Sequence, residues 1–195
     1  MGHRLSKITT RTGDGGETGL GDGSRTRKNS LRIAVLGEVD ELNSAIGVLL
    51  AEPLSGQVRD ALVGIQHDLF DLGAELSIPG RASMADSQVK RIEALLEDFN
   101  STQPPLKEFI LPGGTRAAGL AHLARAVCRR AERSLVAPAL SEKVGEVSRV
   151  YLNRLSDLLF VLGGGPNREG GQGDGLWRQG GTRRAWPTRR PRAQP

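Results

Sequence analysis

The chain of 195 residues contains little cysteine and few aromatic residues. Its single cysteine, Cys128, rules out a disulfide within the chain and indicates a reducing compartment. Aromatic residues make up 4% and β-branched residues are sparse, which disfavours a β-sandwich or barrel. No run of 18 apolar residues exists, and the N-terminus shows no apolar stretch typical of a secretory signal. We therefore expect a cytoplasmic protein without a membrane partner.

The excess of positive charge is confined to one end of the chain. Residues 1–162 contain 20 basic and 20 acidic side chains, whereas residues 163–195 contain seven arginines and two acidic residues. The net charge of +5 therefore indicates no basic groove on the folded domain, and no nucleic-acid partner is expected. Weak RNA contact through the arginine-rich end stays an alternative to a solvated tail.

Composition divides the chain into three zones. Residues 1–30 are polar and rich in glycine, which predicts a loop. Residues 31–162 carry apolar residues at helical spacing. Residues 163–195, with nine glycines and four prolines, predict a disordered tail.

The middle zone predicts five helices joined by short connections. Apolar residues at alternating steps of three and four predict helices over 31–52 and 55–77. A third helix is expected after an Asp86 cap, a fourth over about 115–136, and a fifth from Ser141 to Leu162. In the fourth, the expected buried residues are Leu120, Leu123 and Val127. The predicted fold class is an all-α, five-helix antiparallel bundle.

The N-terminal loop has the composition of an anion-binding segment. It reads Thr10-Arg-Thr-Gly-Asp-Gly-Gly-Glu-Thr-Gly19, in which glycines allow close backbone approach and threonines add hydroxyl donors. It lacks Gly-Lys-Ser/Thr and precedes no strand–helix unit, so it is neither a Walker A loop nor a dinucleotide fingerprint. From composition alone, a flexible leader and a phosphate-binding loop both stay open.

A row of arginines in the fourth predicted helix is the second candidate. Arg125, Arg129 and Arg133 recur every four residues and share a helix face, where like charges repel. Such a row is either a solvated face or the binding surface for an anion. Asn153 interrupts the apolar face of the fifth helix, where an amide needs a partner. Asp40 of the first helix is a candidate ion-pair partner for this row.

Other reactive residue types form no recognisable site. His3, His67 and His122 show no metal-ligand spacing, so no zinc site is predicted. No Ser/His/Asp arrangement resembles a nucleophile elbow. Cys128 is expected to be a small core residue.

Five motifs in order make the sequence similar to a known family. They are Thr10-Arg-Thr-Gly-Asp-x-Gly-x-Thr18, Val39-Asp-Glu-Leu-Asn-Ser44, Phe109-Ile-Leu-Pro-Gly-Gly114, Cys128-Arg-Arg-Ala-Glu-Arg133 and Tyr151-Leu-Asn-Arg-Leu-Ser-Asp-Leu-Leu-Phe160. Over about residues 5–162 the chain resembles the ATP:cob(I)alamin adenosyltransferases of the propanediol-utilisation type. The resemblance implies a homotrimer of five-helix bundles that transfers the 5′-deoxyadenosyl group of ATP to the cobalt of a corrinoid and releases triphosphate.

The resemblance also assigns roles to residues. It implies that Arg129, Phe109 and Asn153 act in catalysis, Phe109 by closing the lower face of the corrin ring. Asp40 and Arg125 match an intersubunit ion pair. Mg²⁺ is expected to arrive with ATP, with no metal site made by protein alone. The implied nucleotide contacts are Thr10, Arg11, Thr12, Gly13, Asp14, Thr18, Gly19, Lys28, Arg129, Arg130, Glu132, Arg133 and Asn153.

The implied chemistry needs no catalytic base, because cobalt(I) is itself the nucleophile. The protein must align the reactants, neutralise triphosphate and exclude water. A cobalamin reductase and a B12-dependent mutase or dehydratase are the expected partners. A non-catalytic ATP and cobalamin escort or sensor is the alternative. The sequence departs from the family where Gly163-Gly-Gly-Pro166 predicts that the last helix stops, although Leu176-Trp177 still matches.

Overall fold

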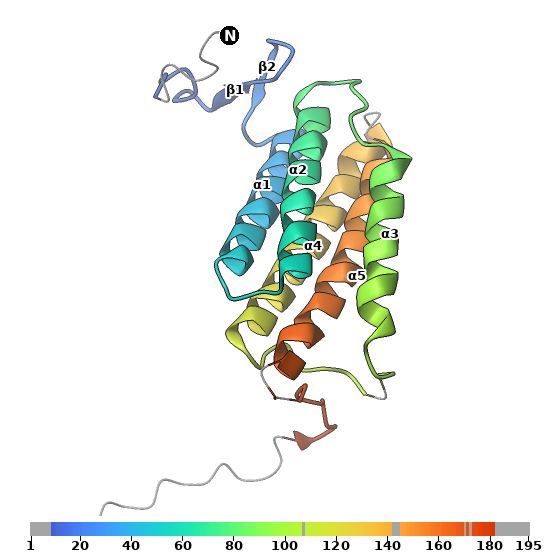
Figure 1. Cartoon of the computed structure of the whole chain (residues 1–195). Coiled ribbons are helices and arrows are strands. Elements are labelled where there is room, and N and C mark those ends of the chain that lie inside the picture. Colours follow the sequence, from blue (N-terminus) through green and yellow to red (C-terminus); the bar gives the residue numbers. More distant parts are fainter. Residues whose placement is uncertain (1–8, 107, 142–144, 170, 172, 182–195) are drawn as a thin grey trace, which may run out of the picture.

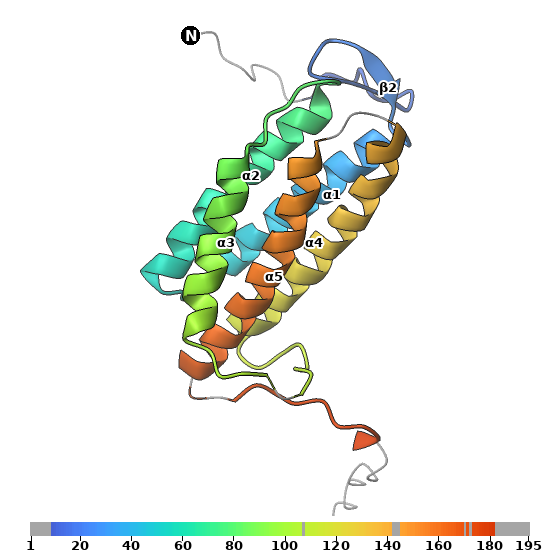
Figure 2. The ribbon, with the colours of Figure 1, turned by 90° about the vertical axis from the view of Figure 1, so that its right-hand side faces the viewer.

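Five helices form the body of the computed structural model, which describes residues 9–106, 108–141, 145–169, 171 and 173–181. Successive helices run up and down along a common axis (Figures 1 and 2). Helix α4 packs against α1 and α5, α2 packs against α1, and α3 packs against α5. The predicted all-α antiparallel bundle is confirmed. The helices are α1 (Leu31–Leu50), α2 (Gly56–Ser77), α3 (Asp86–Ser101), α4 (Arg116–Ser141) and α5 (Glu146–Glu169).

Local capping explains where the first three helices begin. The Ser30 hydroxyl accepts a hydrogen bond from the Ile33 N–H at the start of α1, and Ser55 caps α2 in the same way. The prediction that Asp86 caps the third helix is wrong, because Ala85 occupies that position and its N–H donates to Gln88 Oε1 at 2.8 Å. Asp86 is instead the first helical residue, where a carboxylate favours the positive end of the helix dipole.

The core confirms most of the predicted apolar positions but corrects those of α4. Leu123 is 56% exposed, contrary to the prediction. The buried face of α4 is made of small residues, because the helix is packed between α1 and α5 and close helix approach favours small side chains. Cys128 is buried among them, as predicted, and burial raises the pKa of its thiol. The buried α4 residues include Ala117, Ala118, Ala121, Ala124, Val127, Cys128, Ala131 and Leu135.

Helix α5 runs seven residues past its predicted end at Leu162, through the glycines and Pro166 to Glu169. The prediction that disorder begins at residue 163 is therefore wrong. At Gly163, a Cβ atom would stand 2.9 Å from Nε2 of His122, so the missing side chain lets α4 and α5 approach. Tertiary packing here overrides the low helix propensity of glycine and proline. Residues 182–195 of the predicted tail lie outside the described residues.

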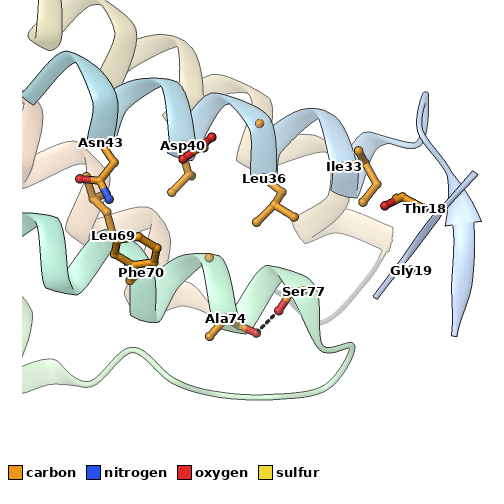
Figure 3. A pocket seen from close by; sticks show the side chains of 13 residues that line it. Thr18, Gly19, Ile33, Leu36, Asp40, Asn43, Leu69, Phe70, Ala74 and Ser77 are labelled. Carbon is orange, nitrogen blue, oxygen red and sulfur yellow. Dashed lines mark hydrogen bonds between the residues drawn. The ribbon is translucent and has the colours of Figure 1, made fainter. Parts of the chain in front are cut away.

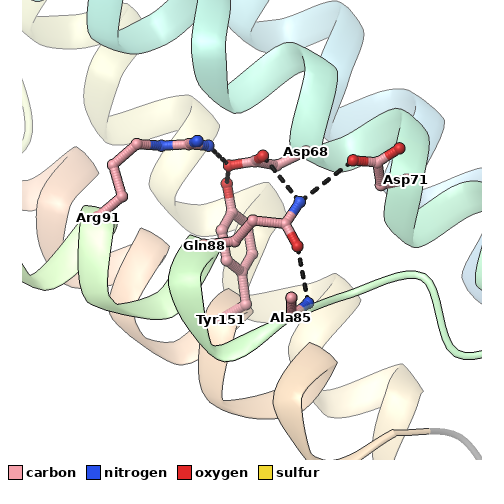
Figure 4. A network of polar contacts seen from close by, with 6 residues as sticks. All are labelled: Asp68, Asp71, Ala85, Gln88, Arg91 and Tyr151. Atoms are coloured by element: carbon pink, nitrogen blue, oxygen red, sulfur yellow. Dashed lines mark hydrogen bonds and ion pairs between the residues drawn. The ribbon is translucent and has the colours of Figure 1, made fainter.

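A buried carboxylate joins α2, α3 and α5. Asp68 accepts a hydrogen bond from the Tyr151 hydroxyl at 2.7 Å and from the Gln88 amide at 2.9 Å, and it pairs with Arg91 (Figure 4). Burial and the adjacent Asp68 raise the pKa of Tyr151. Because Gln88 and Arg91 belong to α3 and Tyr151 belongs to α5, this network fixes the placement of α3 and α5 relative to α2.

Candidate functional site

The N-terminal loop is an ordered hairpin, a feature that composition did not predict. Strands β1 (Glu17–Gly19) and β2 (Arg25–Arg27) pair antiparallel at one end of the bundle (Figure 1). A tight turn precedes them, in which the Gly16 N–H donates to the Gly13 carbonyl at 3.2 Å. Arg11 has φ +58°, a left-handed conformation that non-glycine residues rarely adopt.

Side chains of this loop gather around the turn. The Thr10 and Thr12 hydroxyls lie 2.9 Å apart, and Arg25 donates to the Thr12 carbonyl at 2.8 Å. The ammonium of Lys28 lies over Gly13, 3.0 Å from the point where a Cβ atom would stand. Both threonines and Lys28 are exposed, so hydroxyl donors and a cation face solvent together. This arrangement can receive an oxyanion.

Gly21 fastens the hairpin to the bundle. Its N–H donates to the Ser77 carbonyl at 2.7 Å, at the end of α2. A Cβ atom on Gly21 would stand 2.7 Å from Cγ1 of Ile78, so only glycine allows this approach. The loop is therefore held at a fixed place relative to α1 and α2.

A groove of about 590 Å³ between α1 and α2 begins at this hairpin (Figure 3). Thr18 and Gly19 lie at one end, and Asp40 and Asn43 lie further along α1. Asp40 is exposed and makes no ion pair within the part of the chain that the structure describes. The Oδ1 atom of Asn43 is buried and finds no hydrogen-bond partner within the described ranges. Sequence reasoning missed Asn43, although it lies within the motif that contains Asp40.

The arginine row on α4 does not behave as one surface. Arg129 and Arg133 are exposed and form no ion pair with the described residues. Arg130 pairs with Glu41 of α1 and so faces another neighbour. Arg125 lines a separate cavity and lies 6.0 Å from the Phe160 ring centre.

Glu132 and Asn153, two of the implied nucleotide contacts, meet between α4 and α5. The Asn153 amide donates to Glu132 Oε1 at 2.9 Å and accepts from Arg154 at 2.7 Å. Arg154 also pairs with Glu93 of α3 at 3.0 Å. Asn153 is half-buried and its amide direction is fixed by these bonds. Sequence reasoning missed Arg154, whose position beside Asn153 was the available signal.

The N-terminal loop makes no polar contact with the candidate residues of α4 and α5 in the part of the chain that the structure describes. Among the described residues, no hydrogen bond or ion pair joins the loop to Arg129, Glu132, Arg133 or Asn153. The loop is tied to the end of α2, whereas the others lie on α4 and α5. A single chain thus presents two halves of the predicted nucleotide site.

A second cavity, of about 580 Å³, lies at the opposite end of α4 from the hairpin and contains Phe109. The Phe109 ring is 79% exposed, which excludes a role as a core residue. Its one aromatic contact among the described residues is the ring of Trp177, edge-on at 6.3 Å. The lining residues are Leu106, Glu108, Phe109, Ile110, Pro112, His122, Arg125 and Phe160.

His122 and Arg125 are the polar groups in the depth of this cavity. Both ring nitrogens of His122 and Nε of Arg125 are buried and lack a hydrogen-bond partner among the residues that the structure describes. Burial and the charge of Arg125 lower the pKa of His122, against the opposite effect of Asp174. The imidazole is therefore neutral at pH 7. Apolar walls with a few polar groups suit a large, mostly apolar ligand.

Residues 8–164 match the model of the family described as cobalamin adenosyltransferase. The chain belongs to this family. A cobalamin adenosyltransferase of Cupriavidus metallidurans is 61% identical over 180 residues, covering 92% of this chain and 98% of the relative. A corrinoid adenosyltransferase of Mycobacterium bovis is 45% identical over 196 residues, covering 95% and 100%.

Among solved structures, the fold of this cobalamin adenosyltransferase family member matches a PduO-type ATP:corrinoid adenosyltransferase from Lactobacillus reuteri. The match has a TM-score of 0.82 and 34% identity, and it covers 88% of this chain and 99% of the other. That structure is of a phenylalanine-to-alanine variant complexed with cobalamin and ATP.

Two further features of the described residues concern membranes and metal ions. No helix among them is long and apolar enough to span a bilayer. No cluster of three or more His, Cys, Asp or Glu side chains in the described ranges could hold a metal ion.

Proposed function

We propose that this protein transfers the 5′-deoxyadenosyl group of ATP to cob(I)alamin, giving adenosylcobalamin and triphosphate. One observation carries the proposal: the chain shares 34% identity and a TM-score of 0.82 with an adenosyltransferase that was solved with both cobalamin and ATP. The family match over residues 8–164 covers both halves of the candidate nucleotide site and the cavity at Phe109.

The nucleotide is proposed to bind between the N-terminal loop and helix α4. Exposed hydroxyls of Thr10 and Thr12 and the Lys28 ammonium suit phosphate oxygens, while Arg129 and Arg133 supply positive charge without a competing carboxylate. Asn153, held by Glu132, offers a fixed amide beside them. Mg²⁺ is proposed to enter with the nucleotide, and phosphate oxygens complete its coordination.

The two halves are proposed to meet across a subunit interface in a homotrimer. The lack of a hydrogen bond or ion pair between the two groups within the described part of one chain supports this. Asp40 and Arg125 give a second reason: they line two different cavities, and neither has an ion-pair partner among the described residues. A neighbouring copy supplies the missing charge to each.

The corrin ring is proposed to bind against Phe109. An exposed aromatic ring at the edge of an apolar cavity packs against a flat macrocycle and keeps a lower axial ligand away from the cobalt. Cobalt(I) of the substrate supplies the nucleophile. The protein aligns it with the 5′ carbon, while Arg129 and the loop neutralise the departing triphosphate.

A spectral assay tests the proposal. Purified protein mixed with Mg-ATP and chemically reduced cobalamin should give the spectrum of adenosylcobalamin with release of triphosphate. Binding of both ligands without turnover would instead identify an escort or sensor. Delivery to a B12-dependent mutase or dehydratase, a partner reductase and a cytoplasmic location stay predictions.

A further inference from the structure

Asn167, near the end of α5, is a buried amide with every polar atom of its side chain bonded. It is 1% exposed. Its Oδ1 atom accepts from the Thr115 N–H at 2.7 Å, and its Nδ2 atom donates to the Gly113 carbonyl at 3.1 Å and to Asp174 at 2.8 Å. One side chain thus joins α5, the segment before α4, and the segment after α5.

The segment before α4 is shaped to receive this side chain. Gly114 has φ +99°, and a Cβ atom there would stand 2.1 Å from Oδ1 of Asn167. No other residue type fits both the backbone and the space. The amide therefore occupies the place of a side chain at Gly114, which explains why it reaches the backbone on both sides.

A second set of bonds holds the same segment at its other end. The Leu111 N–H donates to the Gly175 carbonyl at 2.7 Å, and the Trp177 N–H donates to the Phe109 carbonyl at 2.7 Å. Asp174, which Asn167 holds, directly precedes Gly175. Because the Phe109 ring is 79% exposed, core packing does not set its position, and these backbone bonds do.

We propose that Asn167 is a positioning residue, which fixes the backbone of residues 109–115 and the pairing of residues 175–177 with it, and thereby the place of the Phe109 ring. The functional consequence rests on the proposed role of Phe109 beneath the corrin. Asn167 itself does not line the cavity that contains Phe109. Its effect on the reaction is therefore exerted through the loop.

The test compares Asn167→Asp, which keeps the shape but replaces two donor hydrogens by a charge facing Asp174, with the double variant Asn167→Asp/Asp174→Asn. The double variant restores the bond between positions 167 and 174 with donor and acceptor exchanged, but not the bond to the Gly113 carbonyl, which needs a donor at position 167. Gln103→Ala is the matched control, since the Gln103 amide donates to the Val161 carbonyl at 2.7 Å near the same end of α5 without touching residues 109–115.

Two readouts are measured on the full chain. Amide hydrogen exchange at Leu111 and Trp177 should speed up at least tenfold in Asn167→Asp and recover in part in the double variant, which regains the bond to position 174 alone. For adenosylation that starts from cobalt(II), kcat should fall at least tenfold while KM for ATP changes less than threefold. Turnover from pre-reduced cobalt(I) should fall less. The Gln103→Ala protein should resemble the wild type in both readouts.

Unchanged exchange at Leu111 and Trp177 in Asn167→Asp would overturn the proposal, because the amide would then not hold the segment. Faster exchange with full activity from cobalt(II) would overturn the positioning role. Equal losses from cobalt(II) and cobalt(I), without recovery in the double variant, would make Asn167 merely structural. A wild-type protein without turnover would refute the proposed function, and exchange would still decide whether Asn167 holds the loop.

Discussion

The ring of Trp177 meets that of Phe109 edge-on, at 78° and with 6.3 Å between centroids. The contact joins residues 68 positions apart, and the Trp177 N–H also donates to the Phe109 carbonyl. The segment after α5 therefore contacts the Phe109 ring and its backbone, although its composition predicted only a disordered tail.

Two truncations should separate this contact from the rest of the C-terminal end. Ending the chain after Trp177 should leave the melting temperature and turnover nearly unchanged, since residues 178–181 have no hydrogen bond to the bundle and the sequence beyond has no apolar pattern. Ending it after Gly173 removes two backbone hydrogen bonds, the bond from Asn167 to Asp174 and the ring contact, each worth about 0.5–1.5 kcal/mol. Calorimetry should show a lower melting temperature, and the spectral assay a lower turnover, for the second truncation. Equal melting temperatures and equal turnover of the two truncations would contradict this view.

Arg129 should be needed for ATP binding. It is exposed without an acidic partner in the described part of the chain, so its charge is available to phosphates. Removing the partner of a buried anion costs about 2–5 kcal/mol, so Arg129→Ala should lose roughly a hundredfold in ATP affinity by calorimetric titration. Arg116→Ala is the matched control on the same helix, because Arg116 pairs with Glu52 at 3.0 Å at the start of α4 and should change affinity little. Equal losses in both variants would point to a general charge effect.

The helices and most core positions could be predicted because apolar spacing and prolines are local signals. The end of α5 could not, because its contacts with His122 and Gly114 come from residues distant in sequence. The arginines of the row on α4 do not form one surface, for a geometric reason. Four residues overshoot a full helical turn by about 40°, and Arg125 and Arg133 lie about 12 Å apart along the axis. They therefore meet different neighbours. The site roles came from the family resemblance, since composition left the N-terminal loop undecided.

Asp40 and Arg125 should hold the trimer together. Asp40→Arg and Arg125→Asp should each lower the trimer fraction in sedimentation velocity and reduce turnover, because each leaves two like charges facing one another across the interface. The double charge exchange should recover assembly. Trimers of undiminished stability in both single variants, or a fully active monomer, would refute the pair.

The neutral His122 should make stability depend on pH. Its pKa in the folded state is lowered, first by burial and second by the charge of Arg125. Below the ordinary value near 6.5, the imidazole therefore binds a proton in the unfolded chain more readily than in the folded chain. The contribution to stability is present above that value and is lost as pH falls below it. Urea unfolding of His122→Gln between pH 8 and 5 should give a shallower pH dependence than the wild type. Parallel curves would show that His122 does not titrate in this way.

Phe109 provides the sharpest test of the mechanism. Because its ring is 79% exposed and contacts only the Trp177 ring among the described aromatic residues, Phe109→Ala should cost no more than about 1.5 kcal/mol of stability and should leave ATP binding intact. The expected defect is in the corrinoid step. Without the ring beneath the cobalt, four-coordinate cobalt(II) should fail to form, which electron paramagnetic resonance detects directly. Adenosylation from cobalt(II) should then fall far more than adenosylation from pre-reduced cobalt(I), for which the difficult reduction is already complete. Equal losses in the two assays, with four-coordinate cobalt(II) still present, would show that Phe109 does not control the lower axial ligand.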